Sequence, residues 1–201
     1  MAILKLLLED GNDNEKISVI PIVGMGGVGK TALAQSVFNH DSIKHKFDVQ
    51  AWVCVSDDFN EFKVTKDIVE AVTRSACNIN NKELLHLDLK EKLSGKKFLI
   101  VLDDVWTEDY DSWNSLLRPL QYGNKGSIIL VTTRIEKVAS MVQTFQTYHL
   151  EQLSDEDCWS VFANRACFSP KESTENMDLH KIGKEIVRKC KGLPLAAQSL
   201  G

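Results

Sequence analysis

The sequence has no excess of positive charge. Among its 201 residues, 24 are lysine or arginine and 28 are aspartate or glutamate, which gives a formal net charge of −4 at pH 7. This balance argues against broad nucleic-acid binding. Any bound anion must be held by local groups, because the net field of the protein repels it.

The sequence also lacks any Cys-x-x-Cys pair and any metal-ligand spacing of its histidines. Its five cysteines are odd in number and scattered: Cys54, Cys77, Cys158, Cys167 and Cys190. This pattern predicts neither a zinc site nor a disulfide framework, and buried, reduced thiols point to the cytoplasm. The four tryptophans are expected in the core and the five histidines on the surface.

No apolar run is long enough to cross a bilayer. The apolar stretch from Met1 to Leu8 lacks a basic leader and a small-residue cleavage site, and an acidic run follows it. We expect it to be the end of an amphipathic helix. An apolar content of 43% is enough for a proper core.

Glycine, by contrast, is concentrated in one stretch that matches G-x-x-x-x-G-K-[ST], the phosphate-binding P-loop: Gly24, Met25, Gly26, Gly27, Val28, Gly29, Lys30 and Thr31. Glycine leaves backbone N–H groups open to a polyphosphate and permits the positive φ angles of a tight loop. The ammonium of Lys30 suits β- and γ-phosphates, and the hydroxyl of Thr31 suits Mg²⁺.

The context of the loop supports this interpretation over a glycine-rich turn. Residues 17–23 predict a buried strand and residues 32–38 an amphipathic helix. Pro21 conflicts with the strand because it cannot donate a ladder hydrogen bond, so we expect an edge position or a bulge there.

Apolar runs typical of buried strands then alternate with helical patterns. Further strands are expected at residues 48–55, 96–104, 126–134 and 146–150, with helices near 62–72, 84–93 and 111–119. This order predicts an α/β fold with a doubly wound parallel sheet, in which ligands bind at the carboxyl ends of the strands.

From Leu153 onward the patterns are helical only. Ser154 and Asp157 resemble a capping box, and a helix over 177–191 is expected to stop at Gly192. We therefore expect a P-loop nucleotide-binding α/β domain over 1–152 and an incomplete helical subdomain over 153–201.

Two aspartates end the apolar run at 98–102. Asp103 is predicted to bind Mg²⁺, because an aspartate delivered by a buried strand beside a P-loop is the Walker B arrangement. Successive strand side chains point to opposite faces, so Asp104 is free for another role. It is a candidate to position an attacking water as a general base, or alternatively a helix N-cap or structural acceptor.

Arg134 and Pro194 are two further residues with a possible structural explanation. The guanidinium of Arg134 at a strand end could bind a γ-phosphate, or it could pair on the surface with Glu136. Pro194, in Gly192-Leu193-Pro194, is taken from the residues alone as part of a helix stop.

With these residues laid out, the chain resembles the NB-ARC domain of plant nucleotide-binding, leucine-rich-repeat disease-resistance proteins. The blocks that carry the resemblance are 24–34, 47–56, 99–106, 126–134 and 192–196. Trp106 after Asp103-Asp104-Val105 resembles the coiled-coil class of these proteins.

The resemblance implies a signalling switch of plant innate immunity, with ADP in the resting state, ATP in the active state and slow hydrolysis. Arg134 matches the γ-phosphate sensor of the family, and Pro194 matches the proline that packs on adenine. The implied partners are an adenine nucleotide and, in the intact receptor, coiled-coil and leucine-rich-repeat segments and a homo-oligomer.

The sequence departs from the family at a few places. Ala32 replaces a second hydroxyl residue, an upstream arginine-containing segment is absent, and the winged-helix part with its Met-His-Asp motif is missing. These departures predict weaker nucleotide binding than in an intact receptor.

Two functions are alternatives to the signalling switch. One is a P-loop ATPase or phosphotransferase with its own turnover, and the other is a nucleotide-independent interaction domain.

Overall fold

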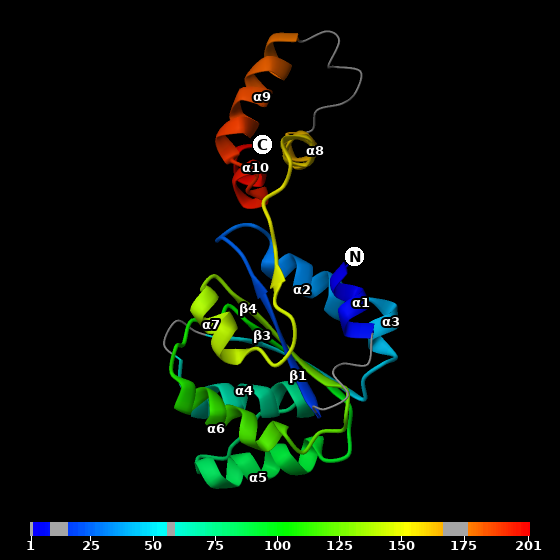
Figure 1. Cartoon of the computed structure of the whole chain (residues 1–201), viewed down its shortest axis with the longest axis vertical. Coiled ribbons are helices and arrows are strands. Elements are labelled where there is room, and N and C mark those ends of the chain that lie inside the picture. The colour runs from blue at the N-terminus through cyan, green and yellow to red at the C-terminus, as the bar shows by residue number, and fades with distance from the viewer. Residues whose placement is uncertain (1, 9–15, 56–58, 167–176) are drawn as a thin grey trace. The chain divides into compact units, whose positions relative to one another are not determined.

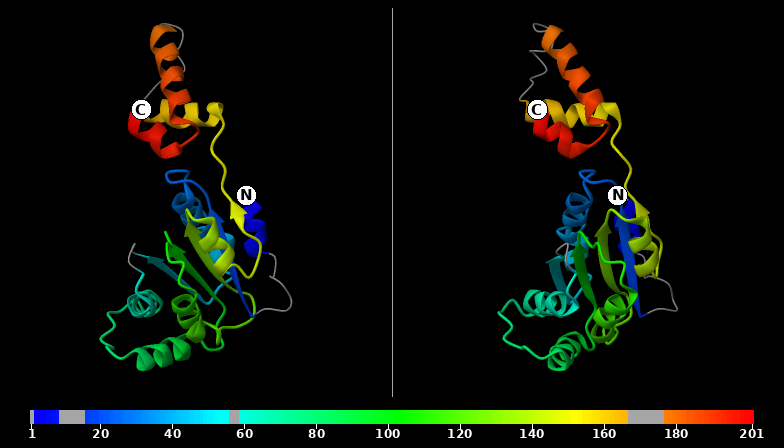
Figure 2. Two further views of the ribbon diagram at one scale, coloured as in Figure 1. Left: turned by 60° about the vertical axis from the view of Figure 1, so that its left-hand side comes forward. Right: turned by 90° about the vertical axis from the view of Figure 1, so that its left-hand side faces the viewer.

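The fold was analysed in a computed structural model, which describes residues 2–8, 16–55, 59–166 and 177–201. By their contacts the residues group into two compact units. The sheet unit comprises Met1–Val23 and Thr31–His149, and the helical unit comprises Gly24–Lys30 and Leu150–Gly201. Figures 1 and 2 show the elements of both units.

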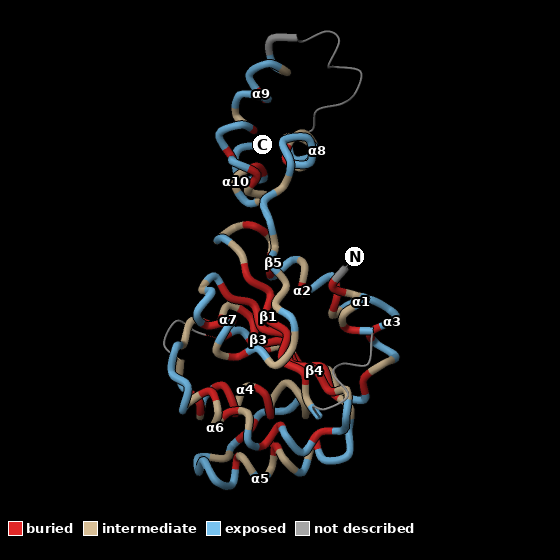
Figure 3. Tube along the Cα trace, in the orientation of Figure 1, coloured by how far each residue is buried: buried red, intermediate tan, exposed pale blue. Residues whose placement is uncertain are grey.

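The sheet unit is built on five parallel strands in the order β2-β3-β4-β1-β5. Their bounds are β1 Ile17–Val23, β2 Val49–Cys54, β3 Phe98–Asp103, β4 Ser127–Thr133 and β5 Tyr148–His149. The predicted parallel sheet is therefore confirmed. Every residue of β3 and β4 is buried, which is why both strands are nearly continuous apolar runs (Figure 3).

Helices connect the strands and cover the sheet. Those of the sheet unit are α1 Ala2–Leu8, α2 Lys30–Phe38, α3 Asp41–Lys44, α4 Glu61–Thr73, α5 Lys82–Leu93, α6 Tyr110–Leu120 and α7 Glu136–Val142. Helices α4, α5 and α6 lie together, away from α1, α2 and α3 (Figures 1 and 2). The sequence did not predict α3 or α7. Both helices are short, and the N-terminus of α7 has no side-chain cap.

The expectation that Pro21 lies on an edge strand or in a bulge is wrong. Strand β1 has neighbours on both sides, and its register with β4 runs without interruption from Ile17 to Val23. The N–H of Val19 donates to Thr144 Oγ1 on the β5 side, and Pro21 faces the same side because strand residues alternate. Strand β5 pairs only with Ile22 and Val23, so at Pro21 no ladder bond is lost.

The helical unit contains α8 Asp155–Arg165, α9 Met177–Cys190 and α10 Pro194–Leu200. The predicted cap of α8 is confirmed: Ser154 Oγ accepts from the N–H of Asp157 at 3.1 Å and donates to Asp157 Oδ2 at 2.8 Å. Gly192 has φ +68°, as expected for a left-handed helix stop, and a Cβ there would lie 2.4 Å from the carbonyl oxygen of Leu153.

Each unit has apolar packing of its own. In the sheet unit one core joins β1–β4 to α4–α7, and residues of α1, α2 and α3 such as Leu7, Val37 and Ile43 are buried outside it. The core of the helical unit is small, formed among the described residues by Cys158, Phe162, Val187, Cys190 and Ala197. Among the helices of the described residues, none is both long and apolar enough to cross a membrane.

Some placements expected from the sequence need correction. Cys54 is a free thiol but exposed, because it ends the edge strand β2; Cys77 is buried, and Cys167 lies outside the described residues. His86 is half-buried because it bonds Glu61, and of the tryptophans only Trp113 is fully buried.

Candidate functional site

The P-loop follows β1 and its last residues open helix α2. Gly27 and Gly29 have φ angles of +79° and +103°, which residues with a Cβ rarely adopt. The ammonium of Lys30 donates to the carbonyl oxygens of Gly24 at 2.8 Å and Met25 at 3.1 Å. The loop thus curls around the ammonium of Lys30, a residue that is only 6% exposed.

Thr31, the next residue, bonds the aspartate at the end of β3. Its hydroxyl donates to Asp103 Oδ1 at 3.0 Å, although the two residues are 72 positions apart. Asp103 is 6% exposed and Thr31 is exposed. The structure therefore brings together the two residues that the sequence predicted to bind a metal ion.

A second hydroxyl holds the same carboxylate. Thr132, near the end of β4, donates to Asp103 Oδ1 at 2.6 Å, and its own oxygen accepts from the N–H of Asp104 at 2.8 Å. The sequence pattern did not indicate a role for Thr132, because one threonine in an apolar strand carries no local signal. Only its position opposite the end of β3 reveals the contact.

Asp104 leaves the strand in a left-handed conformation with φ +60°. It does not cap a helix, because α6 begins at Tyr110 and is capped by Asp109. Its side chain is 37% exposed, and Oδ2 accepts from the guanidinium of Arg134 at 3.4 Å.

Arg134 follows β4 and is therefore at the same edge of the sheet. Besides its long contact with Asp104, the guanidinium lies 4.8 Å from the centre of the Trp106 ring. The alternative pairing with Glu136 is not observed in the structure, where Glu136 contacts His149 instead. A side chain that is 46% exposed and held by two weak contacts can exchange its partner readily.

The oxygen groups of the sheet unit fit a hard divalent cation. In the described part of the chain, Asp103 Oδ1 has two donors and Oδ2 accepts no hydrogen bond. Thr31 uses its proton for Asp103, so the lone pairs of its oxygen stay available. A carboxylate and a hydroxyl are ligands that Mg²⁺ takes, usually beside several waters and a phosphate.

Within the helical unit, Pro194 is the first residue of α10, and the next residue contacts the P-loop. The N–H of Leu195 donates to the carbonyl oxygen of Gly27 at 3.2 Å. A Cβ on Gly27 would lie 3.2 Å from the Cβ of Leu195. A nucleotide-binding role for Pro194 was indicated only by the family resemblance, and no sequence pattern indicated a role for Leu195.

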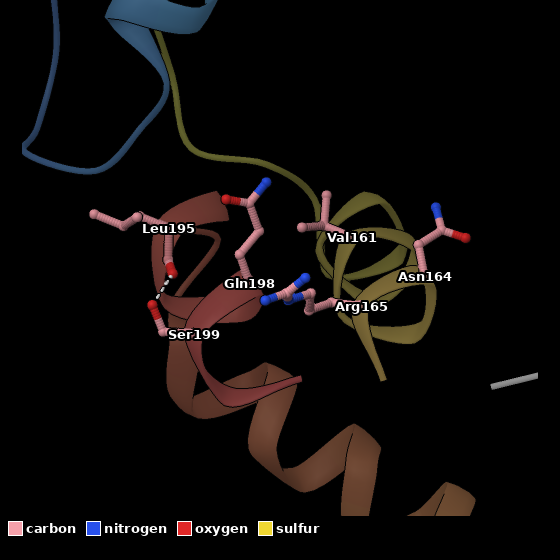
Figure 4. Close-up of a pocket in the computed structure, with 6 residues that line it drawn as sticks. All are labelled: Val161, Asn164, Arg165, Leu195, Gln198 and Ser199. Carbon is pink, nitrogen blue, oxygen red and sulfur yellow. Dashed lines mark hydrogen bonds between the residues drawn. The ribbon is translucent and has the colours of Figure 1, made fainter. Parts of the chain in front are cut away.

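An open hollow of about 550 Å³ lies between α8 and α10 (Figure 4). It is lined by Val161, Asn164, Arg165, Leu195, Gln198 and Ser199. The hydroxyl of Ser199 donates to the carbonyl oxygen of Leu195 at 2.8 Å. The side chain of Leu195, 59% exposed, therefore borders both this hollow and Gly27.

The chain is similar to known sequences. The NB-ARC domain family matches residues 1–172. "Putative disease resistance protein RGA1" of Solanum bulbocastanum is 47% identical over 199 residues, which covers 99% of this chain and 20% of that protein. "Putative disease resistance RPP13-like protein 1" of Arabidopsis thaliana is 42% identical over 198 residues, which covers 98% of this chain and 19% of that protein. The chain spans about a fifth of the length of these relatives.

Solved structures share the fold. A Signal Transduction ATPase with Numerous Domains (STAND) protein of Pyrococcus horikoshii superposes with a TM-score of 0.51 at 20% identity, covering 90% of this chain and 26% of that one. The Aeropyrum pernix ORC2 protein superposes with a TM-score of 0.58 at 16% identity, covering 98% of this chain and 57% of that one. At these identities the likeness shows the P-loop fold alone. The family match and the relatives, taken with the sheet and its P-loop, show that this chain belongs to the NB-ARC domain family.

Proposed function

We propose that this chain is the adenine-nucleotide switch module of a plant immune receptor. ADP is bound in the resting state, ATP in the active state, and hydrolysis between them is slow. The observation that carries the proposal is the hydrogen bond between Thr31, directly after the P-loop lysine, and Asp103 at the end of β3. Membership of the NB-ARC family supports it.

In this proposal, the backbone amides of Gly24–Lys30 and the ammonium of Lys30 bind the phosphates. Thr31 and Asp103 hold Mg²⁺, which when bound screens the charge of the phosphate oxygens. Arg134 contacts the γ-phosphate and Pro194 packs on adenine, both by their match to the family. Asp104 positions the attacking water.

The proposal extends to the intact receptor. We place the nucleotide-binding domain at 1–152 and the helical subdomain at 153–201, and we propose a cytoplasmic location. The names of the relatives, which are disease resistance proteins, support the setting in defence. The coiled-coil and leucine-rich-repeat segments and a homo-oligomer complete the proposed set of partners.

The nucleotide that co-purifies with the protein tests this function most directly. The protein is denatured, and the released nucleotide is identified by chromatography. We expect ADP in near-stoichiometric amount, because a resting switch exchanges it slowly. Protein that carries no nucleotide and binds none on addition would contradict the proposal.

Turnover separates a switch from an enzyme with its own substrate. Typical enzymes turn over at about 1 s⁻¹ or faster. We expect the release of phosphate from ATP to be far slower than this. A rate of about 1 s⁻¹ would favour the P-loop ATPase with Asp104 as its base.

A further inference from the structure

The hydroxyl of Thr132 is shared between two neighbouring aspartates. It donates to Asp103 Oδ1 at 2.6 Å and accepts from the N–H of Asp104 at 2.8 Å. Thr132 is 1% exposed, so water does not compete for either bond. A hydroxyl has one proton to give and lone pairs to accept with, and here both functions are used.

The backbone of Thr132 also holds the chain that leaves β3. The regular pairing of β3 with β4 ends at Leu102 and Val131. One residue further, the carbonyl oxygen of Thr132 accepts from the N–H of Val105 at 2.9 Å. Asp104, at φ +60°, lies between two residues that Thr132 contacts. A non-glycine residue in this conformation is strained and persists only where its surroundings fix it.

The two hydroxyls on Asp103 come from different elements. Thr31 lies in α2 and Thr132 in β4, and both donate to Oδ1. The terminal torsion of an aspartate is broad, so a single donor to one oxygen leaves the carboxylate free to rotate. Two donors from different elements fix Oδ1, and they thereby fix the direction of Oδ2, which accepts no hydrogen bond from the described residues.

We propose that Thr132 is a positioning residue for the magnesium-bound nucleotide. Its hydroxyl aims the carboxylate of Asp103 at the metal ion and, through the N–H of Asp104, fixes the left-handed turn that presents Asp104 to Arg134. This inference rests on the proposed binding of a magnesium nucleotide. It adds a residue that touches neither the nucleotide nor the metal and acts through Asp103.

The variants Thr132→Ser and Thr132→Ala test this role, because they differ from each other by one oxygen atom. The measurement is a Mg²⁺ titration of ADP affinity by calorimetry, from EDTA to saturating metal. We expect Thr132→Ala to raise the Mg²⁺ concentration for half-maximal effect at least about tenfold, a typical consequence of losing a residue that orients a metal ligand. Affinity for ADP in EDTA should stay unchanged, and Thr132→Ser should titrate as the parent does.

Thr133→Val is the matched control. Thr133 is also fully buried in β4, but its hydroxyl accepts from the N–H of Ile135 at 3.1 Å and not from either aspartate. We expect this variant to lower the melting temperature without moving the Mg²⁺ midpoint. If Thr132→Ala lowered ADP affinity equally with and without metal, or left the midpoint in place, Thr132 would be structural and the inference wrong.

Asp103→Ala separates this inference from the proposed function. If the parent gains affinity with Mg²⁺ and Asp103→Ala loses the gain while Thr132→Ala keeps it, the inference alone fails. If the parent binds no ADP, or shows no gain with Mg²⁺, the proposed magnesium site fails first. Should Thr132→Ala not fold, Thr132→Val keeps the shape without the hydroxyl and carries the same expectation.

Discussion

At the scale of single residues, the candidate site depends on a few short contacts, some at the carboxyl ends of β3 and β4 and others within the P-loop. Asp103 has two hydroxyl donors within 3.0 Å, and Lys30 has two carbonyl acceptors within 3.1 Å. Such charge-assisted bonds are worth more than neutral ones, and truncating a partner of Asp103 or Lys30 leaves a buried charged group with one bond fewer. Substitutions of these residues should therefore have large and specific effects on nucleotide affinity.

Lys30→Ala should lower the affinity for ADP at least about tenfold, because bonds from a charged group contribute roughly 1.5–3 kcal/mol each. Calorimetry with ADP measures this. Lys63→Ala, on the exposed face of α4, changes the net charge equally and should bind as the parent does. Full affinity in Lys30→Ala would show that the phosphates bind elsewhere.

Arg134→Ala should weaken ATP binding about tenfold and leave ADP binding nearly unchanged, because only ATP has the γ-phosphate that the guanidinium is proposed to contact. Competition between the two nucleotides measures the ratio of the affinities for ATP and ADP. Lys137→Ala, which removes an exposed cation paired with Glu108, is the control. Equal losses for ATP and ADP would exclude the sensor role.

At the scale of secondary-structure elements, the strands were the most predictable part. Residues 98–102 and 128–131 are uninterrupted apolar runs because helices cover both faces of the sheet, and both were predicted as strands correctly. Helix α3 was missed because its four residues leave no room for a periodic pattern. Pro21 was misplaced because the position of β5, two residues long, follows from no local pattern.

A buried carboxylate connects three helices of the sheet unit. Glu61, 9% exposed at the start of α4, contacts Lys82 at 2.7 Å and His86 at 2.6 Å in α5. Ser115 of α6 donates to it at 3.4 Å. Burial by itself raises the pKa of Glu61, but the hydrogen bonds and charges of Lys82 and His86 outweigh it and lower the pKa below its ordinary value near 4.5.

This lowered pKa predicts how stability depends on pH. Ionised Glu61 stabilises the fold fully above pH 4.5, and the stabilisation is lost as the pH falls through the lower pKa of the folded state. Glu61→Gln should reduce the free energy of unfolding by about 2 kcal/mol at pH 7, and its difference from the parent should shrink toward pH 3.

Urea unfolding followed at pH 7, 5, 4 and 3 measures this difference. Glu83→Gln, an exposed position in α5, should leave the profile of the parent unchanged. A constant difference between Glu61→Gln and the parent at every pH would show that the charge of Glu61 does not carry the effect.

At the scale of the whole molecule, the chain forms two units with separate cores. The larger core belongs to the sheet unit, whereas the buried apolar residues of the helical core are few and come from α8, α9 and α10. Small cores stabilise less, because they bury less apolar surface for each ordered residue. Among the described residues of this unit, Phe162 is the buried aromatic side chain, so the stability of the helical unit should depend strongly on it.

Phe162→Ala should cost the helical unit about 3–5 kcal/mol. We expect amide hydrogen exchange in α8 and α10 to become fast, while β3 and β4 keep their protection. Leu179→Ala removes a side chain that is 50% exposed and should change neither. Loss of protection in the strands of Phe162→Ala would mean that the two cores unfold together.

The sequence by itself determined the features whose cause is local. The glycines of the P-loop, the apolar strands, the cap at Ser154 and the stop at Gly192 depend on neighbours within a few residues, and each was predicted correctly in kind. The family resemblance likewise needs only the order of its blocks along the chain.

Only the tertiary structure decided the strand order, the network of Glu61 and the role of Thr132. Asp103 finds its two hydroxyl donors 72 and 29 positions away, in α2 and β4. Hydrogen bonds between residues so distant in sequence are created by packing strands side by side, and a polar residue inside an apolar strand does not indicate which carboxylate it will meet.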